Sequence, residues 1–366
     1  MKINSLKVQN YRNIENIEIN PSDGVNIIYG NNAQGKTNLL EAMWLFTGCR
    51  SFRGSKEKEL IRFGCDFSKT EMNFFDEMRN RTAVITIDEK KHLELDGVNF
   101  SSCSELFGEF FGIIFTPDHL NLVKGGPAER RKFINTALCQ LKPKYSNVLG
   151  KYNKILEQRN TLLKDISYHS DLTETLDIWD EKFSFYSAVI ISQRLRYLEE
   201  IKPFLENIYE GISSGREKIS LEYDSPISYE EKNTEILREK ILYELKRSRD
   251  EDIRNGITSL GPHKDDILIK LDGISAKAFA SQGQKRSCAL SLKLSEAAVM
   301  KKITGRQPIA FLDDVMSELD DSRQDYLLNH IDDWQVFITC CDPSSILKTK
   351  NGKIFEMCGG KICSCT

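Results

Sequence analysis

One loop near the start of the sequence has the residue types that hold phosphate groups. The stretch GNNAQGKT at 30–37 places four residues between two glycines and follows the second with a lysine and a threonine. The glycines let backbone N–H groups curl around phosphates, Lys36 offers a charge to the β- and γ-phosphates, and Thr37 offers a hydroxyl to Mg²⁺. A glycine-rich turn that caps a helix is the alternative. The residues expected to bind ATP are Gly30, Asn31, Asn32, Ala33, Gln34, Gly35, Lys36, Thr37 and Asn38.

An acidic pair far downstream could complete this site. Residues 308–312 (PIAFL) have the composition of a buried strand, and Asp313 and Asp314 follow directly. In that position Asp313 can hold Mg²⁺ through water together with Thr37, and Asp314 can orient or deprotonate the water that attacks the γ-phosphate. An acidic pair that caps a helix is the alternative. We expect Lys36, Asp313 and Asp314 to be the catalytic residues.

A short segment between these motifs, SQGQKR at 281–286, comes directly before a helix expected to begin near Ser287. A serine and a glycine at a helix N-terminus form an anion site. Because the chain already has one phosphate loop, this second site either binds another anion or contacts the nucleotide held by a second copy of the protein. An ordinary helix N-cap is the simpler interpretation of the isolated hexapeptide.

Strands and helices alternate in the outer thirds of the chain, where these motifs lie. Alternating apolar residues predict a hairpin with its turn at Arg12 and Asn13, and a helix is expected from Lys36 to a stop at Gly48. Further strands are expected at 24–30, between about 80 and 98, and at 110–117, 267–271, 308–312 and 335–339, with helices at 287–300 and 322–331.

The middle of the sequence has a helical pattern from Pro127 to about Ser248. Apolar residues at 145–166 surround a polar Arg159, a second stripe runs through 172–190, and the polar link SYHSD predicts an antiparallel helical hairpin. The sequence therefore predicts one α/β domain, split by an inserted helical arm. The expected limits are 1–120 for the first part of the head, 121–250 for the arm and 251–366 for the second part.

The composition is that of a globular protein with two or three domains: 366 residues, 40% of them apolar. The 51 Lys and Arg nearly balance the 54 Asp and Glu, so binding to nucleic acid would need a local basic patch. No apolar run is long enough for a signal peptide or a membrane span, and the ten cysteines lack paired CxxC spacing. We expect a cytoplasmic protein with mostly free thiols and a frayed tail at GGKICSCT, a soft-metal site there being the alternative.

The order of the motifs resembles that of the ABC-type ATPases, in which two protomers sandwich two ATPs: the phosphate loop, the inserted helices, the SQGQ segment and an acidic strand continued by SELD. Four further segments accompany GNNAQGKTN, SQGQKR and LDDVMSELD: YRN at 11–13, SFR at 51–53, FTPDHLNLVKGGPAERRKFI at 115–134 and GPHKDD at 261–266. Together these segments resemble the RecF family across nearly the whole chain.

The resemblance implies an ABC-type P-loop ATPase head, with a mixed sheet and flanking helices, plus the inserted arm. It places Arg12 and Asn13 near the nucleotide and Ser317 and Asp320 in a loop that crosses the dimer seam. It implies an ATP-dependent homodimer that clamps double-stranded DNA near single-strand gaps, releases it by slow, DNA-dependent hydrolysis, and works with RecR and RecO to load RecA. The signature residues that would act in trans are Ser281, Gln282, Gly283, Gln284 and Lys285, and among them Ser281, Gly283 and Gln284 would contact the partner's γ-phosphate.

Some residues depart from the ABC pattern. Asp314 stands where most ABC ATPases have glutamate, which could slow turnover, and the switch histidine is absent from ITCCD, where Thr339 and Cys340 stand. His263 is interpreted as structural. The basic clusters 130–132 and Arg53, Lys56 and Lys58 could contact DNA phosphates or be solvated surface.

Three other functions fit these motifs less well. A transporter ATPase subunit would carry an LSGGQ-like signature, a catalytic glutamate and a switch histidine, all of which differ here. A small-molecule P-loop kinase would have no need of the SQGQ segment. An SMC-like protein would have a much longer coiled coil than the inserted helices provide.

Overall fold

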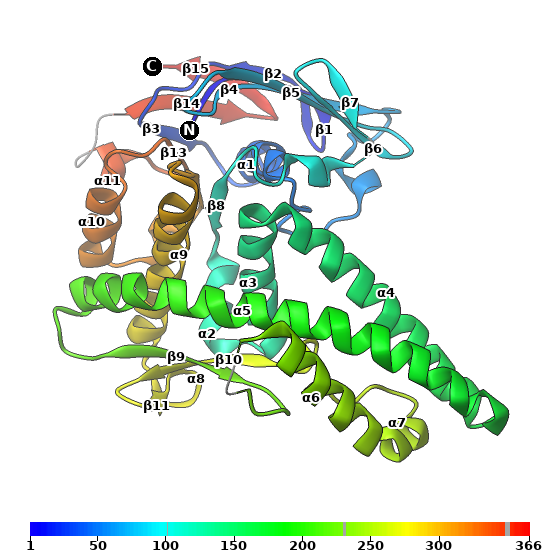
Figure 1. Ribbon diagram of the computed structural model, residues 1–366. Coiled ribbons are helices and arrows are strands. Elements are labelled where there is room, and N and C mark those ends of the chain that lie inside the picture. Colours follow the sequence, from blue (N-terminus) through cyan, green and yellow to red (C-terminus); the bar gives the residue numbers. More distant parts are fainter. Residues whose placement is uncertain (101, 230–231, 348–351) are drawn as a thin grey trace. The chain divides into compact units, whose positions relative to one another are not determined.

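The computed structural model describes residues 1–100, 102–229, 232–347 and 352–366, which form two compact units (Figure 1). Unit 1 contains Met1–Asn121, Ile208–Arg216 and Gln282–Thr366; unit 2 contains Leu122–Asn207 and Glu217–Ser281. Unit 2 is thus inserted in sequence within unit 1, and it extends to Ser281. The domain limits expected at residues 120 and 250 stay predictions.

Unit 1 has a six-stranded sheet whose strands come from both ends of the chain. In order across the sheet they are β15 (Lys361–Cys365), β14 (Gly352–Cys358), β3 (Val25–Tyr29), β13 (Val336–Cys340), β12 (Ile309–Asp313) and β8 (Gly112–Phe115). All neighbours are parallel except β14 and β15. Strands β8, β12 and β13 are buried along their whole length, as expected for apolar runs in a parallel sheet. The predicted α/β unit split in sequence is therefore present.

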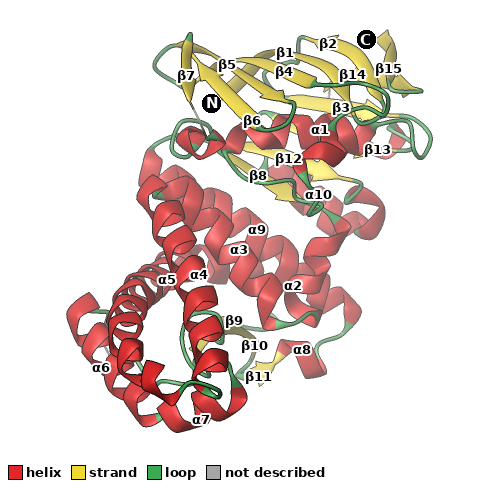
Figure 2. Ribbon diagram, turned by 90° about the vertical axis from the view of Figure 1, so that its right-hand side faces the viewer, coloured by secondary structure: helices red, strands yellow, loops and turns green. Residues whose placement is uncertain are grey.

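A second, antiparallel sheet in unit 1 has the order β2 (Ile14–Ile19), β1 (Lys2–Tyr11), β4 (Ser68–Phe75), β5 (Asn80–Ile87), β6 (Lys91–Leu95) and β7 (Val98–Phe100). The β1–β2 hairpin turns at Arg12 and Asn13, as predicted, whereas β4 was not expected. Helix α1 (Lys36–Trp44) contacts β1 of this sheet and β12 and β13 of the other, and Figure 2 shows it between the two sheets. The described part of unit 1 also contains helices α9 (Gln282–Thr304), α10 (Asp321–His330) and α11 (Ser344–Leu347).

Unit 2 is mainly helical. Its elements include α3 (Pro127–Leu141), α4 (Pro143–Ile166), α6 (Thr234–Arg247), α7 (Arg249–Asn255) and α8 (Ala276–Phe279), and most of α5 (Leu176–Ser213). Helix α2 (Asn121–Lys124) precedes α3. The helical hairpin predicted around residues 167–171 is formed by α4 and α5. Among the described residues, no helix is both long and apolar enough to cross a membrane.

The sequence-based expectation was wrong for one part of unit 2. Residues 219–224 form strand β9 (Ile219–Asp224), not a helix, and they pair with β10 (Asp266–Leu271), which in turn pairs with β11 (Ile274–Ser275). Strand β10 was expected in the α/β domain but belongs to this small antiparallel sheet. The alternation of apolar and polar residues in ISLEYD is short. Because the helical pattern on both sides of it is longer, the sequence predicts a helix through this segment.

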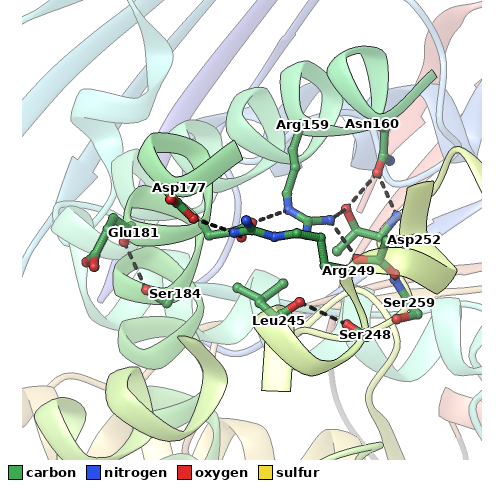
Figure 3. Close-up of polar contacts among 12 residues, drawn as sticks. Arg159, Asn160, Asp177, Glu181, Ser184, Leu245, Ser248, Arg249, Asp252 and Ser259 are labelled. Carbon is green, nitrogen blue, oxygen red and sulfur yellow. Dashed lines mark hydrogen bonds and ion pairs between the residues drawn. The ribbon is translucent and has the colours of Figure 1, made fainter. Parts of the chain in front are cut away.

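A buried ionic network ties together the helices of unit 2 (Figure 3). Arg159 of α4 is fully buried; its Nε donates to Asp180 of α5 at 2.8 Å, and its Nη1 donates to Asp252 of α7 at 2.8 Å. The same Nη1 donates to the Thr258 hydroxyl at 2.8 Å, and Arg249 donates to the second Asp180 oxygen at 2.8 Å. The network therefore fixes α4, α5, α7 and the following loop against one another.

Candidate nucleotide-binding site

The predicted phosphate loop connects β3 to α1, so it has the expected strand and helix on either side. Gly30 and Gly35 have φ of +148° and +105°, which side chains rarely adopt. A Cβ on Gly30 would lie 2.4 Å from the Met357 carbonyl oxygen, and one on Gly35 would lie 2.7 Å from Asn13 Oδ1. The backbone conformation therefore favours glycine at both positions, and at Gly30 the close approach of the Met357 backbone excludes any side chain as well.

The Lys36 ammonium lies inside the curve of this loop. Its Nζ donates to the carbonyl oxygens of Gly30 at 2.5 Å and Asn31 at 3.0 Å, and lies 3.7 Å from Cys341 Sγ. The Cys341 thiol also donates to Asn32 Oδ1 at 3.2 Å. The lysine side chain is thus held by neutral acceptors at the N-terminus of α1, where an anion would be a stronger partner.

The acidic pair meets the loop at the end of β12. Thr37 donates its hydroxyl to Asp313 Oδ1 at 2.8 Å, and Thr339 donates to the same oxygen at 2.8 Å. Burial raises the pKa of the Asp313 carboxyl, while these two hydrogen bonds oppose the rise. Hydroxyl and carboxylate oxygens are ligands that suit Mg²⁺, which keeps several waters, so Thr37 and Asp313 fit the predicted metal role. Asp314 follows with φ of +52°.

Comparisons with known proteins place this arrangement in a family. Residues 2–357 match the family model described as RecF/RecN/SMC N terminal domain. The DNA replication and repair protein RecF of Agathobacter rectalis is 41% identical over 99% of each chain, and that of Ruminiclostridium cellulolyticum is 38% identical over 100% of each. The chain belongs to the RecF family.

Solved structures similar to this chain support its membership of this family. One described as the recombination mediator protein RecF-ATPrS in RecFOR pathway superposes with a TM-score of 0.93 at 35% identity, covering 98% of this chain and 97% of the other. A SmcHead bound to the C-winged helix domain of ScpA matches with a TM-score of 0.58 at 16% identity over 100% and 97% of the two chains, which shows a shared fold. The predicted fold class, an ABC-type P-loop ATPase head with an inserted helical segment, is confirmed.

The YRN segment at 11–13 lies beside the phosphate loop. Asn13 donates to the Ala33 carbonyl oxygen at 3.3 Å and accepts from Asn38 Nδ2 at 2.8 Å. The Arg12 guanidinium is paired with the fully buried Glu41 of α1 at 2.5 Å, a partner that the sequence reasoning missed. A single acidic residue within the otherwise apolar run LLEAMWLF at 39–46 was the available signal.

Three arginines of the basic clusters that could contact DNA have partners within the structure. Arg53 donates to Asn38 Oδ1 at 2.8 Å, which places it beside the phosphate loop. Arg130 is buried and makes a bidentate pair with Asp266 at 2.7 and 2.8 Å, and Arg131 donates to the Asp265 carbonyl oxygen at 2.8 Å. Arg130 therefore has a structural role in unit 2.

The signature residues Gln282, Gly283, Gln284 and Lys285 form the first turn of α9, so the expectation of a helix starting near Ser287 was wrong by about one turn. Ser281 directly precedes this helix. A Cβ on Gly283 would lie 3.3 Å from the Arg323 guanidinium, which donates to Ser287 at 2.8 Å. The signature turn of this RecF-family chain is thus packed against α10.

The predicted dimer-seam loop is tied to the same helices. Ser317 donates to the Asp314 carbonyl oxygen at 2.9 Å, and Asp320 caps α10 by accepting from the Arg323 N–H at 3.1 Å. Glu318 pairs with Arg286 of α9 at 3.1 Å. The loop therefore links the end of the acidic strand to the signature turn.

The C-terminal tail supports the phosphate loop, which corrects the expectation of a frayed end. Strands β14 and β15 form a hairpin whose turn residues donate backbone N–H groups to Gln34: Gly359 to the side-chain oxygen, and Gly360 to the carbonyl oxygen at 2.9 Å. Gly360 has φ of +78°, and a Cβ there would lie 2.3 Å from the Asn13 carbonyl oxygen. The hairpin is therefore in direct contact with two segments of the site.

We expect Gly360→Ala to weaken both folding and nucleotide binding. Gly359 has φ of +56°, and a Cβ there would have nothing within 4 Å, so Gly359→Ala is the matched control. Both variants lose about 1 kcal/mol of stability to the left-handed backbone, and Gly360→Ala loses a further amount of about 1–3 kcal/mol to the clash with backbone. Urea unfolding and titration with a fluorescent ATP analogue measure the two effects. Equal behaviour of the two variants would contradict a supporting role for the turn.

His263 of the GPHKDD segment is held inside unit 2. The Tyr152 hydroxyl lies 2.6 Å from its Nδ1, and its Nε2 lies 3.1 Å from the Thr258 carbonyl oxygen. A neutral imidazole satisfies both contacts, with Nε2–H donating to the carbonyl and Nδ1 accepting from the hydroxyl. Burial lowers the pKa of His263 to about 4. These contacts support the structural interpretation.

The same histidine predicts an acid sensitivity of folding. Its pKa is about 4 in the folded chain against 6.5 ordinarily, so the unfolded chain binds the proton first and stability falls as the pH drops from 6.5 towards 4. Between pH 7 and 5 this contributes a loss of about 1–2 kcal/mol. Urea unfolding at both pH values should show a smaller loss for His263→Gln than for wild type. Identical pH dependence would rule out this contribution.

Proposed function

We propose that this chain is an ATP-dependent DNA-binding protein of recombinational repair and replication-fork maintenance. Relatives named as DNA replication and repair proteins, and neighbours described as RecF-ATP and RecF-ATPrS in RecFOR pathway, support this proposal. The observation that carries the ATPase part is the meeting of Thr37 with Asp313 at 2.8 Å, beside the loop that encloses Lys36.

In this proposal the chain binds ATP through the residues 30–38, with Asn13 against the loop. The Lys36 ammonium exchanges its carbonyl partners for phosphate oxygens, which are charged and therefore bind it more strongly. Thr37 and Asp313 would hold Mg²⁺, directly or through water, and the ion would neutralise charge on the β- and γ-phosphates. Asp314 would orient or deprotonate the attacking water. The short side chain of Asp314 is consistent with a weak ATPase.

We further propose that ATP joins two copies of the chain. Ser281 and the first turn of α9 would contact the γ-phosphate held by the other copy, and Ser317 and Asp320 would lie at the seam. Supporting this, the seam loop and the signature turn are linked within unit 1 through Arg286 and Glu318. The closed homodimer would clamp double-stranded DNA near a gap until hydrolysis releases it, and would act with RecR and RecO in loading RecA.

DNA binding is tested by fluorescence anisotropy on gapped and blunt duplexes, with and without Mg²⁺ and ATP. We expect the tightest binding to the gapped duplex with ATP, and a strong decrease with salt because no motif suggests contacts to base edges. An affinity for duplex DNA that is the same with and without Mg²⁺ and ATP would contradict the proposal.

Dimerisation is tested separately by sedimentation velocity. Wild type should sediment as a dimer with Mg²⁺ and ATP, and a folded Ser281→Arg protein should remain a monomer because the larger cationic side chain blocks the interface. If both remain monomers, the contact in trans is wrong. With membership of the RecF family shown, the transporter and kinase alternatives have no supporting observation.

A further inference from the structure

One buried hydroxyl is bonded to both residues of the acidic pair. Thr339 lies on β13, which runs parallel to β12 with Thr339 in register with Asp313. Its side chain is fully buried. The Thr339 hydroxyl donates to Asp313 Oδ1 at 2.8 Å and accepts from the Asp314 backbone N–H at 2.9 Å. A single atom therefore touches both of the acidic residues proposed for catalysis.

The direction of these bonds is fixed by chemistry. A backbone N–H can only donate, so Thr339 Oγ1 accepts from Asp314 and its one proton is available for the Asp313 carboxylate. Asp313 Oδ1 also accepts from Thr37, so two hydroxyls hold the same oxygen. This arrangement directs the carboxylate of Asp313 towards the hydroxyl at the start of α1.

The bond to Asp314 holds an unfavourable backbone conformation. Asp314 has φ of +52°, a region that residues other than glycine occupy at a cost and keep only where their surroundings fix them. The hydrogen bond from Asp314 N to Thr339 Oγ1 is such a constraint. Since φ determines where the Cβ of Asp314 points, Thr339 also influences the position of that carboxylate.

We propose that Thr339 is a positioning residue for ATP hydrolysis, which sets the orientation of Asp313 and the backbone conformation of Asp314 from the neighbouring strand. The inference rests on the proposed ATPase function. Thr339 is fully buried and bonded to both aspartates, so its effect passes through them. A displacement of about 1 Å in a group that orients a reacting water can lower the rate about 100-fold.

The test compares Thr339→Val, which keeps the shape and removes the hydroxyl, with Thr339→Ser, which keeps the hydroxyl. We expect the valine variant to lose about 10-fold or more in kcat while its affinity for ATP changes less than about 3-fold. It should also need more Mg²⁺ for half-maximal rate, because Asp313 is less well oriented. Serine should restore both values to within about 3-fold of wild type.

Circular dichroism and urea unfolding of each full-length variant accompany the rate measurements, and Thr339→Ala replaces the valine variant if that protein does not fold. The inference is overturned if wild type hydrolyses ATP and removal of the hydroxyl leaves kcat and the Mg²⁺ requirement unchanged. It is also overturned if serine behaves like valine. A wild-type protein that binds ATP without hydrolysing it would instead contradict the proposed ATPase, and the role of Thr339 would fall with it.

Discussion

Replacing Arg159 with alanine is expected to lower the free energy of unfolding of unit 2 by about 3–5 kcal/mol. Arg159, Asp180 and Asp252 are all fully buried. Without the guanidinium, Asp180 keeps its contact with Arg249, whereas Asp252 loses its cationic partner in surroundings where an unpaired charge is costly. Urea unfolding of the full chain, with hydrogen exchange to locate the change in α4, α5 and α7, measures the effect.

Arg238→Ala is the matched control for this prediction. Arg238 makes ion pairs of similar length, 2.8 Å to Glu181 and 3.0 Å to Glu235, but all three side chains are partly exposed to solvent. An exposed pair contributes at most about 1 kcal/mol, because water screens the charges and the long side chains lose entropy. Similar losses in the two variants would show that burial does not set the strength of the Arg159 network.

The phosphate loop and the acidic strand could be predicted because their chemistry fixes residue types within a few positions. Gly30, Gly35, Lys36 and Thr37 each have a requirement that few other residues meet, so the local geometry follows from the sequence. The pairing of distant strands does not follow in the same way. Parallel strands are joined through long connections, and no local signal shows that β3 lies between β13 and β14.

The contacts that sequence reasoning missed depend on residues far apart in the chain. Arg159 stood out as a polar residue in an apolar stripe, but its partner Asp252 lies 93 positions away. From the sequence, Thr339 only stands where a switch histidine is expected, since nothing in ITCCD shows that β13 lies beside β12. The Gly359-Gly360 pair was a local signal for a hairpin turn. It was outweighed by the tendency of chain ends to fray.

Lys36→Ala is expected to remove the stabilisation of the protein by ATP. A ligand that binds only the folded state at 100 times its Kd stabilises it by about 2.7 kcal/mol, which raises the Tm of wild type measurably. The variant lacks the ammonium that Gly30 and Asn31 hold within the phosphate loop, so the same concentration of Mg²⁺ and ATP should leave its Tm unchanged. Hydrolysis should fall by about 100-fold or more, because this charge also stabilises the transition state.

Lys2→Ala is the control for Lys36→Ala, because it removes a lysine of unit 1 that pairs with Asp23 at an exposed position. It should keep the full response to ATP. The two variants together separate a general effect of charge from the specific effect of one ammonium. If Lys36→Ala still gained stability from Mg²⁺ and ATP, the backbone N–H groups of the loop and the Thr37–Asp313 pair would have to hold the nucleotide without it. ATP-dependent DNA binding by the variant should then persist as well, which anisotropy on the gapped duplex would show.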